Sequence, residues 1–160
     1  MKKNEIVIPV TVYKDVQELT SEDAMLMQKA TDAKQKAYAP YSKFSVGAAL
    51  LLENGQIITG NNQENAAYPS GMCAERIAIW KAGSEFPKMV VKKLAIIASS
   101  LITPVTKPIA PCGACRQTLS EYEINQQKPI EVLFMGEVGE IIKTTSLISL
   151  LPFSFDNTFL

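Results

Sequence analysis

The chain has 160 residues, with 16 basic and 16 acidic side chains and a formal net charge of zero. Apolar residues make up 47% of it, which argues against a disordered chain. The balanced charge argues against tight binding to nucleic acid, which depends on a basic surface. The chain contains no histidine, so Ser-His-Asp triads, Cys-His pairs and histidine-ligated metal sites are excluded.

The N-terminal residues predict an arm over residues 1–20 ahead of a single domain over residues 21–160. Ile6–Val12 alternates loosely and predicts either a short strand or an extended segment. Glu5 and Pro9 interrupt any signal-peptide core. The longest apolar run, Val46–Leu52, is far shorter than the ~20 residues that span a bilayer. We therefore expect a cytoplasmic protein with no membrane partner.

A helix is predicted directly after this arm. Thr20–Asp23 combines a hydroxyl cap with acidic residues in the first turn, which is typical of a helix start. Apolar residues then recur at helical spacing from Met25 to Ala37, and Pro40 limits the helix near Tyr38.

A β-hairpin follows. The apolar runs Val46–Leu52 and Gln56–Gly60 flank an Asn54-Gly55 pair. An Asn-Gly pair in this setting is typical of a type I′ turn, in which both central residues take positive φ.

The remaining chain alternates between helices and strands. Helices are predicted over Cys73–Ala82 with Gly83 as the C-cap, over Cys112–Tyr122 and over Ser146–Leu151. Strands are predicted over Lys93–Ser99, Ile130–Phe134 and Glu140–Lys143, and loops over 61–72 and 101–111. This order of elements predicts an α/β fold of three layers, α/β/α, around a mixed five-stranded sheet.

The three cysteines all stand at the starts of predicted helices, Cys73 at one, Cys112 and Cys115 at the other. An odd number of cysteines does not favour a disulfide framework. The orphan N–H groups and partial positive charge of a helix N-terminus stabilise thiolates. Because Cys112 and Cys115 are three residues apart, they share one helix face. With Cys73 they make a set of three soft ligands, which favours zinc.

The number of ligands bears on what such a zinc would do. A structural zinc uses four protein ligands, whereas a catalytic zinc uses three and leaves the fourth position to water. Because the chain has no fourth cysteine and no histidine, the composition favours an open, hydrolytic site whose metal makes water acidic enough to supply hydroxide.

Two charged residues close to Cys73 complete this hypothesis. Glu75 is the natural proton shuttle in a chain without histidine. Three thiolates on a divalent ion leave an excess negative charge, which would make the water less acidic. Arg76 is three residues after Cys73 and can donate hydrogen bonds to the sulfurs, so we expect it to offset this charge together with the two helix N-termini.

Several motifs carry a family resemblance. Cys73-Ala-Glu-Arg76 and Pro111-Cys-Gly-Ala-Cys-Arg-Gln117 resemble the two zinc motifs of the cytidine deaminases, in the small three-cysteine form. Tyr41–Leu50 resembles the first strand of that family, Asn62–Tyr68 its ribose-binding loop, and Leu150–Phe155 its C-terminal segment. The motifs occur in the family's order over roughly residues 21–155.

The resemblance implies a cytidine deaminase-like fold and the reaction of that family, a step of pyrimidine salvage. Cytidine and deoxycytidine would be hydrolysed to uridine and deoxyuridine with release of ammonia. One zinc per chain would be held by Cys73, Cys112 and Cys115, and a zinc-activated water would attack C4 of the pyrimidine. Glu75 would take a proton from the water, deliver one to N3 and help to protonate the leaving amine.

The resemblance also implies how the substrate is bound. Asn62 and Glu64 would hydrogen-bond the ribose hydroxyls, while Phe44 would pack on the base and Ala74 would contact the substrate. Small members of the family are homotetramers with sites near their interfaces. Tyr68 and Phe155 would accordingly act across subunit contacts.

Other interpretations of the same residues stay open. The cysteines could be buried thiols, or a closed structural zinc could have an acidic fourth ligand, and Cys112 and Cys115 could form a redox pair. Glu75 and Arg76 could be ordinary surface charges.

Alternative functions are a deaminase of the same superfamily that acts on a nucleotide or polynucleotide, and a zinc-stabilised binding protein without turnover. A polynucleotide enzyme is expected to have a basic groove, and a nucleotide enzyme to have basic residues near the ribose loop. The segment 61–71 contains none. Glu75 argues against a purely structural zinc, because a carboxylate beside the metal has no role at a site without an open position.

Overall fold

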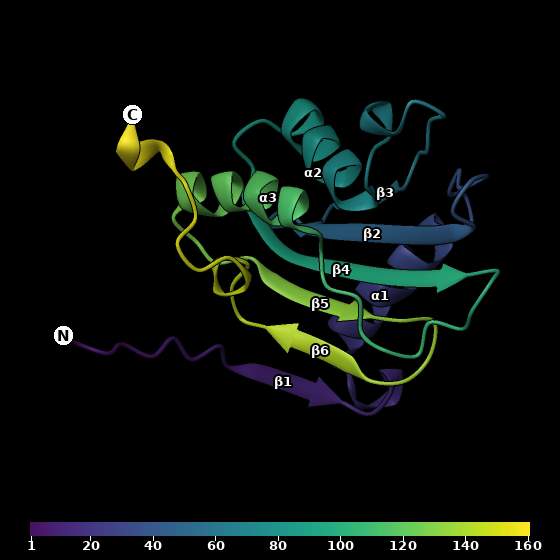
Figure 1. The fold of residues 1–160 in the computed structure, drawn as a ribbon, viewed down its shortest axis with the longest axis horizontal. Helices are drawn as coiled ribbons and strands as arrows, with labels where there is room; N and C mark the ends of the chain where they lie inside the picture. Colours follow the sequence, from purple (N-terminus) through teal and green to yellow (C-terminus); the bar gives the residue numbers. More distant parts are fainter.

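The computed structural model describes all residues from 1 to 160, and it shows a mixed sheet with helices on both faces (Figure 1). The strands are β1 (Val10–Tyr13), β2 (Phe44–Leu52), β3 (Ile57–Asn61), β4 (Val91–Ser100), β5 (Glu131–Met135) and β6 (Ile141–Thr144). The α-helices are α1 (Ser21–Lys34), α2 (Ala74–Glu85) and α3 (Gly113–Gln126). Short 3-10 helices are η1 (Val16–Glu18), η2 (Tyr68–Ser70), η3 (Ile148–Leu150) and η4 (Asn157–Phe159). None of the helices is long and apolar enough to cross a membrane.

The sheet order is β1-β6-β5-β4-β2-β3. Only β4 and β5 pair in parallel, and α3 connects them, since parallel neighbours need a crossover. The predicted α/β fold with three layers is confirmed, but the predicted count of five strands is wrong. The sixth strand is β1, whose residues Val10–Tyr13 lie in the predicted arm and pair antiparallel with β6. The β-branched residues of β1 suit a strand, and β6 without it would be an unpaired edge.

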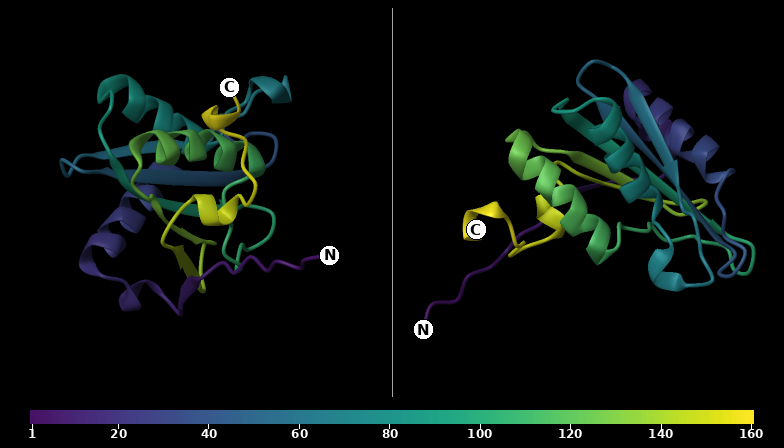
Figure 2. Two further views of the ribbon diagram at one scale, coloured as in Figure 1. Left: turned by 90° about the vertical axis from the view of Figure 1, so that its left-hand side faces the viewer. Right: turned by 90° about the horizontal axis from the view of Figure 1, so that it is seen from above.

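The two faces of the sheet carry separate hydrophobic cores. Side chains along β2 alternate between them, because successive residues of a strand point to opposite faces. Leu50 and Leu52 pack in the core under α2 and α3, while Ala49 and Leu51 pack in the core under α1. Figure 2 shows the sheet between these helix layers. Burial on both faces explains why β2 reads as a continuous apolar run.

Two glycines allow helices to lie directly on the sheet. A Cβ atom on Gly47 would lie 2.0 Å from the backbone oxygen of Ala30 in α1. A Cβ atom on Gly60 would lie 2.3 Å from the backbone oxygen of Ala74, at the start of α2. The contact at Gly47 places α1 directly on β2, and the contact at Gly60 fixes the position of the α2 N-terminus on β3.

The helix ends differ from the predicted ones. Helix α1 ends at Lys34 rather than near Tyr38, and Met25, the first residue of the predicted apolar spacing, is exposed. Gly83 is not a C-cap, because α2 continues through it to Glu85. Its lack of a side chain instead admits the hydroxyl of Tyr122 from α3, which would lie 2.9 Å from a Cβ atom there.

The hairpin between β2 and β3 forms, but its turn is not of type I′. Gly55 has a positive φ of 83°, whereas Asn54 does not adopt a positive φ. The amide of Gly55 donates to the carbonyl of Leu52 at 3.0 Å, and the amide of Gln56 donates to the side chain of Asn54 at 3.0 Å. The turn therefore needs only one left-handed residue, which glycine provides without strain.

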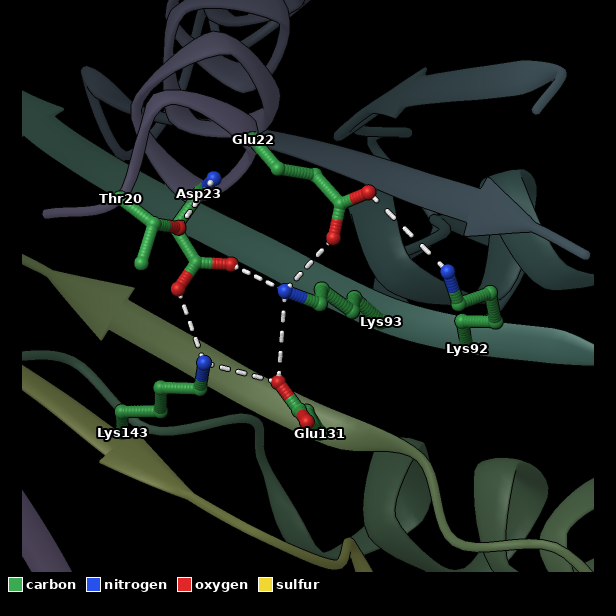
Figure 3. Close-up of polar contacts among 7 residues, drawn as sticks. All are labelled: Thr20, Glu22, Asp23, Lys92, Lys93, Glu131 and Lys143. Carbon is green, nitrogen blue, oxygen red and sulfur yellow. Dashed lines mark hydrogen bonds and ion pairs between the residues drawn. The ribbon is translucent and has the colours of Figure 1, made fainter.

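A cluster of charged side chains attaches α1 to the sheet (Figure 3). The fully buried carboxylate of Asp23 accepts from Lys93 on β4 at 2.6 Å and from Lys143 on β6 at 2.8 Å. Glu131 on β5 lies 2.8 Å from Lys143, and Glu22 lies 2.8 Å from Lys93. Burial alone would raise the pKa of Asp23, but the hydrogen bonds from the two lysines outweigh burial and hold that pKa below its ordinary value.

Candidate active site

The three cysteines meet where the N-termini of α2 and α3 come together. Cys73 is the N-cap residue of α2, Cys112 is the N-cap residue of α3, and Cys115 is buried in the first turn of α3. Their sulfur atoms all lie within 4.8 Å of one another, and the Sγ atoms of Cys73 and Cys112 are 3.9 Å apart. The structure thus brings together the predicted ligand set from two helices.

The geometry of these sulfurs fits zinc. Tetrahedral zinc has Zn–S bonds of about 2.3 Å, which place neighbouring sulfurs about 3.8 Å apart. The group contains only these three cysteines, with no carboxylate or other residue as a fourth ligand. The three cysteines could therefore hold one zinc ion and leave its fourth position free.

Hydrogen bonds within this group also favour the thiolate form of Cys73. Hydrogen bonding with Cys115, followed by Arg76 and Cys112, outweighs burial and lowers the pKa of Cys73 to about 5. The same hydrogen bond with Cys73, together with burial, raises the pKa of Cys115. One negative charge is therefore already stable among the three sulfurs before a cation neutralises the group.

Glu75 and Arg76 both lie in the first turn of α2, and both line a cavity beside the three cysteines. Glu75 is only 5% exposed, and burial raises its pKa, helped by the negative charge of Cys73. Arg76 donates from Nη2 to the sulfur of Cys73 at 3.6 Å and lies over the ring of Trp80, 5.8 Å from its centroid. The hydrogen bond predicted from Arg76 to a ligand sulfur is therefore present.

A cavity of about 590 Å³ opens in front of these groups. Its walls come from β2, the segment that follows β3, the start of α2 and the loop before α3. Most of the predicted site residues line it: Phe44, Asn62, Glu64, Tyr68, Cys73, Ala74, Glu75, Arg76 and Cys112. Cys115 contributes to the sulfur group from behind this wall. The cavity also includes residues that were not predicted as site residues, among them Ser42, Met72 and Ile109.

Asn62 is tied to the neighbouring strand by both ends of its amide group. Its Nδ2 donates to the carbonyl of Phe44 at 2.9 Å, and its Oδ1 accepts from the amide of Val46 at 2.8 Å. Asn62 therefore holds the backbone of Phe44 beside the cavity. One N–H of its amide group remains for another partner.

Glu64 faces the turn before β2. Its Oε2 accepts from the backbone amides of Tyr41 at 2.9 Å and Ser42 at 3.3 Å, and its Oε1 accepts from the Ser42 hydroxyl. The hydrogen bond from the Ser42 side chain is the largest cause of a lowered pKa at Glu64. The carboxylate is therefore ionised at neutral pH and acts only as an acceptor.

The two residues predicted to act across subunit contacts lie in different places. Tyr68 lines the cavity, is 74% exposed and has its ring 6.2 Å from that of Tyr41. Phe155 does not line the cavity: its carbonyl accepts from Gln117 on α3 at 2.8 Å, and its exposed ring stacks on Phe159. Within one chain, then, Tyr68 stands at the cavity while Phe155 does not.

Comparison with known proteins agrees with this site. Residues 20–128 match the family described as the cytidine and deoxycytidylate deaminase zinc-binding region. A cytidine deaminase of Halalkalibacterium halodurans is 40% identical over 131 residues, which cover 82% of this chain and 92% of the relative. A cytidine deaminase of Sporosarcina psychrophila is 41% identical over 130 residues, which cover 81% of this chain and 88% of the relative.

Solved structures agree as well. The crystal structure of cytidine deaminase from Burkholderia pseudomallei superposes with a TM-score of 0.73 at 37% identity, covering 86% of this chain and all of the other. The structure of cytidine deaminase from Mycobacterium tuberculosis gives a TM-score of 0.63 at 32% identity, over 82% of this chain and 94% of the other. With the sulfur group and the fold in agreement, this chain belongs to the family of zinc-binding cytidine and deoxycytidylate deaminases.

Proposed function

We propose that this protein hydrolyses cytidine and deoxycytidine to uridine and deoxyuridine and releases ammonia. The observation that carries the proposal is the group of three sulfurs without a fourth protein ligand, placed on the wall of a cavity that also contains a buried carboxylate. Relatives that match most of the chain are cytidine deaminases, which supports the same substrate class.

The three cysteines would hold the zinc, and Arg76 would stabilise the thiolate of Cys73 through the hydrogen bond described above. Zinc bound there supplies an acidic water near neutral pH as the nucleophile. The positive charge of Arg76 and the two helix N-termini offset the excess negative charge of three thiolates, which would otherwise weaken that effect.

Glu75 would move the protons. It takes one from the attacking water, delivers one to N3 of the pyrimidine and helps to protonate the leaving amine. Its burial favours the protonated form, which suits a carboxyl group that must carry a proton between two positions. Ala74 precedes Glu75 at the start of the helix and lines the cavity beside it, so its contact with the base is proposed on the same grounds.

Nucleosides fit the rest of the cavity better than nucleotides do. Phe44 offers an aromatic ring for the base, while Asn62 offers a free N–H and Glu64 an ionised acceptor for sugar hydroxyls. The segment 61–71 has no basic residue, and a phosphate placed near the Glu64 carboxylate would be repelled by it.

We further propose a homotetramer in which Tyr68 and Phe155 contact the site of a neighbouring subunit. The support is a group of exposed aromatic side chains in the C-terminal segment: the rings of Phe155 and Phe159 stack on each other and are 57% and 68% exposed, and Phe153 is 94% exposed. Exposed apolar groups of this kind favour a subunit contact.

Three free thiols also fit a reducing compartment such as the cytoplasm.

The substrate assay is direct. Purified protein is incubated separately with cytidine, CMP, cytosine and a short single-stranded oligonucleotide, and the deaminated product of each is measured by chromatography. We expect turnover of cytidine and one zinc per chain by elemental analysis. If only the oligonucleotide or only CMP is deaminated, the proposed nucleoside substrate is wrong. Full zinc content with no turnover of any compound would indicate a zinc-stabilised binding protein.

A further inference from the structure

The turn before β2 forms a small anion-binding cradle around Glu64. It is tightly wound, since Lys43 adopts a left-handed φ of 56° and its amide donates to the carbonyl of Ala39 at 3.2 Å. The backbone amides of Tyr41 and Ser42 and the Ser42 hydroxyl all donate to the Glu64 carboxylate. From this arrangement we infer that Ser42 is a positioning residue, which orients Glu64 for the sugar of the substrate; the inference rests on the proposed nucleoside deaminase function.

The direction of the Ser42 hydroxyl follows from its other partner. Its oxygen accepts a hydrogen bond from the amide of Phe44 at 3.0 Å. A serine hydroxyl has one proton to donate, and here that proton is directed to Oε1 of Glu64. The amide of Phe44 therefore orients the hydroxyl, and the hydroxyl in turn orients the carboxylate.

The count of acceptor sites shows what remains for a ligand. An ionised carboxylate has about four lone-pair sites, and the turn uses three of them on Glu64. About one site is left to accept from a sugar hydroxyl. Without the Ser42 hydroxyl, Oε1 loses its partner and the carboxylate can rotate about its remaining bonds, so the free site is no longer held in one direction.

Removing the Ser42 hydroxyl also removes the acceptor of the Phe44 amide, but that hydrogen bond is exposed and water can replace it. The remaining contacts of the turn do not depend on the Ser42 side chain. Phe44 pairs with Ser100 across β2 and β4, and its carbonyl accepts from Asn62. The two backbone amides that face Glu64 are present whatever side chain stands at position 42. Because Ser42 is exposed, replacing it with alanine leaves no cavity in the core. We therefore expect Ser42→Ala to keep the fold, the zinc and the contact of Phe44 with the base.

Steady-state kinetics of four single variants and one double variant test this. The substrates are cytidine and 2′,3′-dideoxycytidine, which lacks both sugar hydroxyls near the base. We expect Ser42→Ala to raise KM for cytidine about three- to tenfold, the effect of one lost hydrogen bond, with kcat within about twofold. KM for dideoxycytidine should change less than about twofold. Ser42→Thr, which keeps the hydroxyl, should restore the KM of the unaltered enzyme.

The controls separate this inference from the proposed function. Ser45→Ala removes a hydroxyl from β2, directly after the turn and on the face opposite Phe44, and should leave the KM of both substrates unchanged. Glu64→Gln should raise KM for cytidine, and combining it with Ser42→Ala should add little, because both changes act through one carboxylate.

Each contrary result has a distinct meaning. An equal effect of Ser42→Ala on both substrates, or additive effects in the double variant, would overturn the inference and leave the deaminase function standing. So would an effect of Glu64→Gln without one of Ser42→Ala. If Glu64→Gln has no effect, its role at the sugar is wrong, and if the unaltered enzyme does not convert cytidine, the proposed function falls together with the inference.

Discussion

Asp23→Asn perturbs the charged cluster that attaches α1 to the sheet (Figure 3). Asparagine keeps the shape of the side chain but removes the negative charge between Lys93 and Lys143. The Asp23 side chain is 0% exposed, and the two lysine side chains are 12% and 16% exposed. Water therefore cannot replace the lost partner fully, and the positive charges are left poorly compensated.

The size of the expected loss in stability depends on the ion pairs that Lys93 and Lys143 retain. Removing one partner of a buried ion pair costs about 3–5 kcal/mol. Lys93 and Lys143 retain Glu131 at 3.5 and 2.8 Å, so we place Asp23→Asn at the lower end, with a loss of about 3 kcal/mol in the free energy of unfolding. For a domain of this size that loss corresponds to a fall in Tm of about 6–12 °C.

Urea denaturation followed by circular dichroism at pH 7 measures this loss. The matched control is Glu53→Gln, because the Glu53–Lys128 pair has the same 2.8 Å separation but both side chains are more than half exposed. An exposed pair contributes less than about 1 kcal/mol. If Asp23→Asn is no more destabilising than Glu53→Gln, burial does not strengthen this cluster and the argument is refuted.

The pH dependence of stability, compared between the unaltered protein and Asp23→Asn, gives a second test. Asp23 has a pKa below its ordinary value of 3.8, so its ionised form stabilises the fold at every pH above that ordinary value. The contribution is lost as the pH falls through the lowered pKa. The difference in unfolding free energy between the unaltered protein and Asp23→Asn should therefore be constant from pH 7 to pH 5 and shrink near pH 3. A difference that already shrinks above pH 5 would contradict this sign.

Three further changes test the site and the packing. Glu75→Gln should lower kcat about 10²- to 10⁴-fold while zinc content stays at one per chain; near-normal turnover would remove Glu75 from proton transfer. Cys112→Ala should lose zinc by elemental analysis, because two sulfurs cannot replace three, and full occupancy would show that the ligand assignment is wrong. Gly47→Ala should cost about 3 kcal/mol, since its Cβ would lie 2.0 Å from the Ala30 oxygen. Gly113→Ala, whose Cβ meets nothing within 4 Å, should change stability by less than about 1 kcal/mol, and equal effects at the two glycines would contradict the packing argument.

Local patterns in the chain were sufficient for much of the site. The start of each cysteine-led helix, the spacing of Cys112 and Cys115 and the place of Glu75 after Cys73 all depend on residues within one helical turn. Capping and side-chain periodicity act over that same range, so the sequence alone determined which groups stand at which helix ends. The count of three sulfur ligands without histidine likewise needed only the composition.

Contacts between distant residues were decided by the tertiary structure. Cys73 meets Cys112 across 39 positions, and Ser42 meets Glu64 across 22, because the strand order and the glycine contacts bring these segments together. Asp23 belonged to an ordinary acidic first turn by sequence, yet it is buried between two lysines from β4 and β6. The strand β1 also depends on a free edge at β6. Pattern and propensity describe one segment at a time, whereas burial and pairing depend on which segments become neighbours, and only the folded chain determines that.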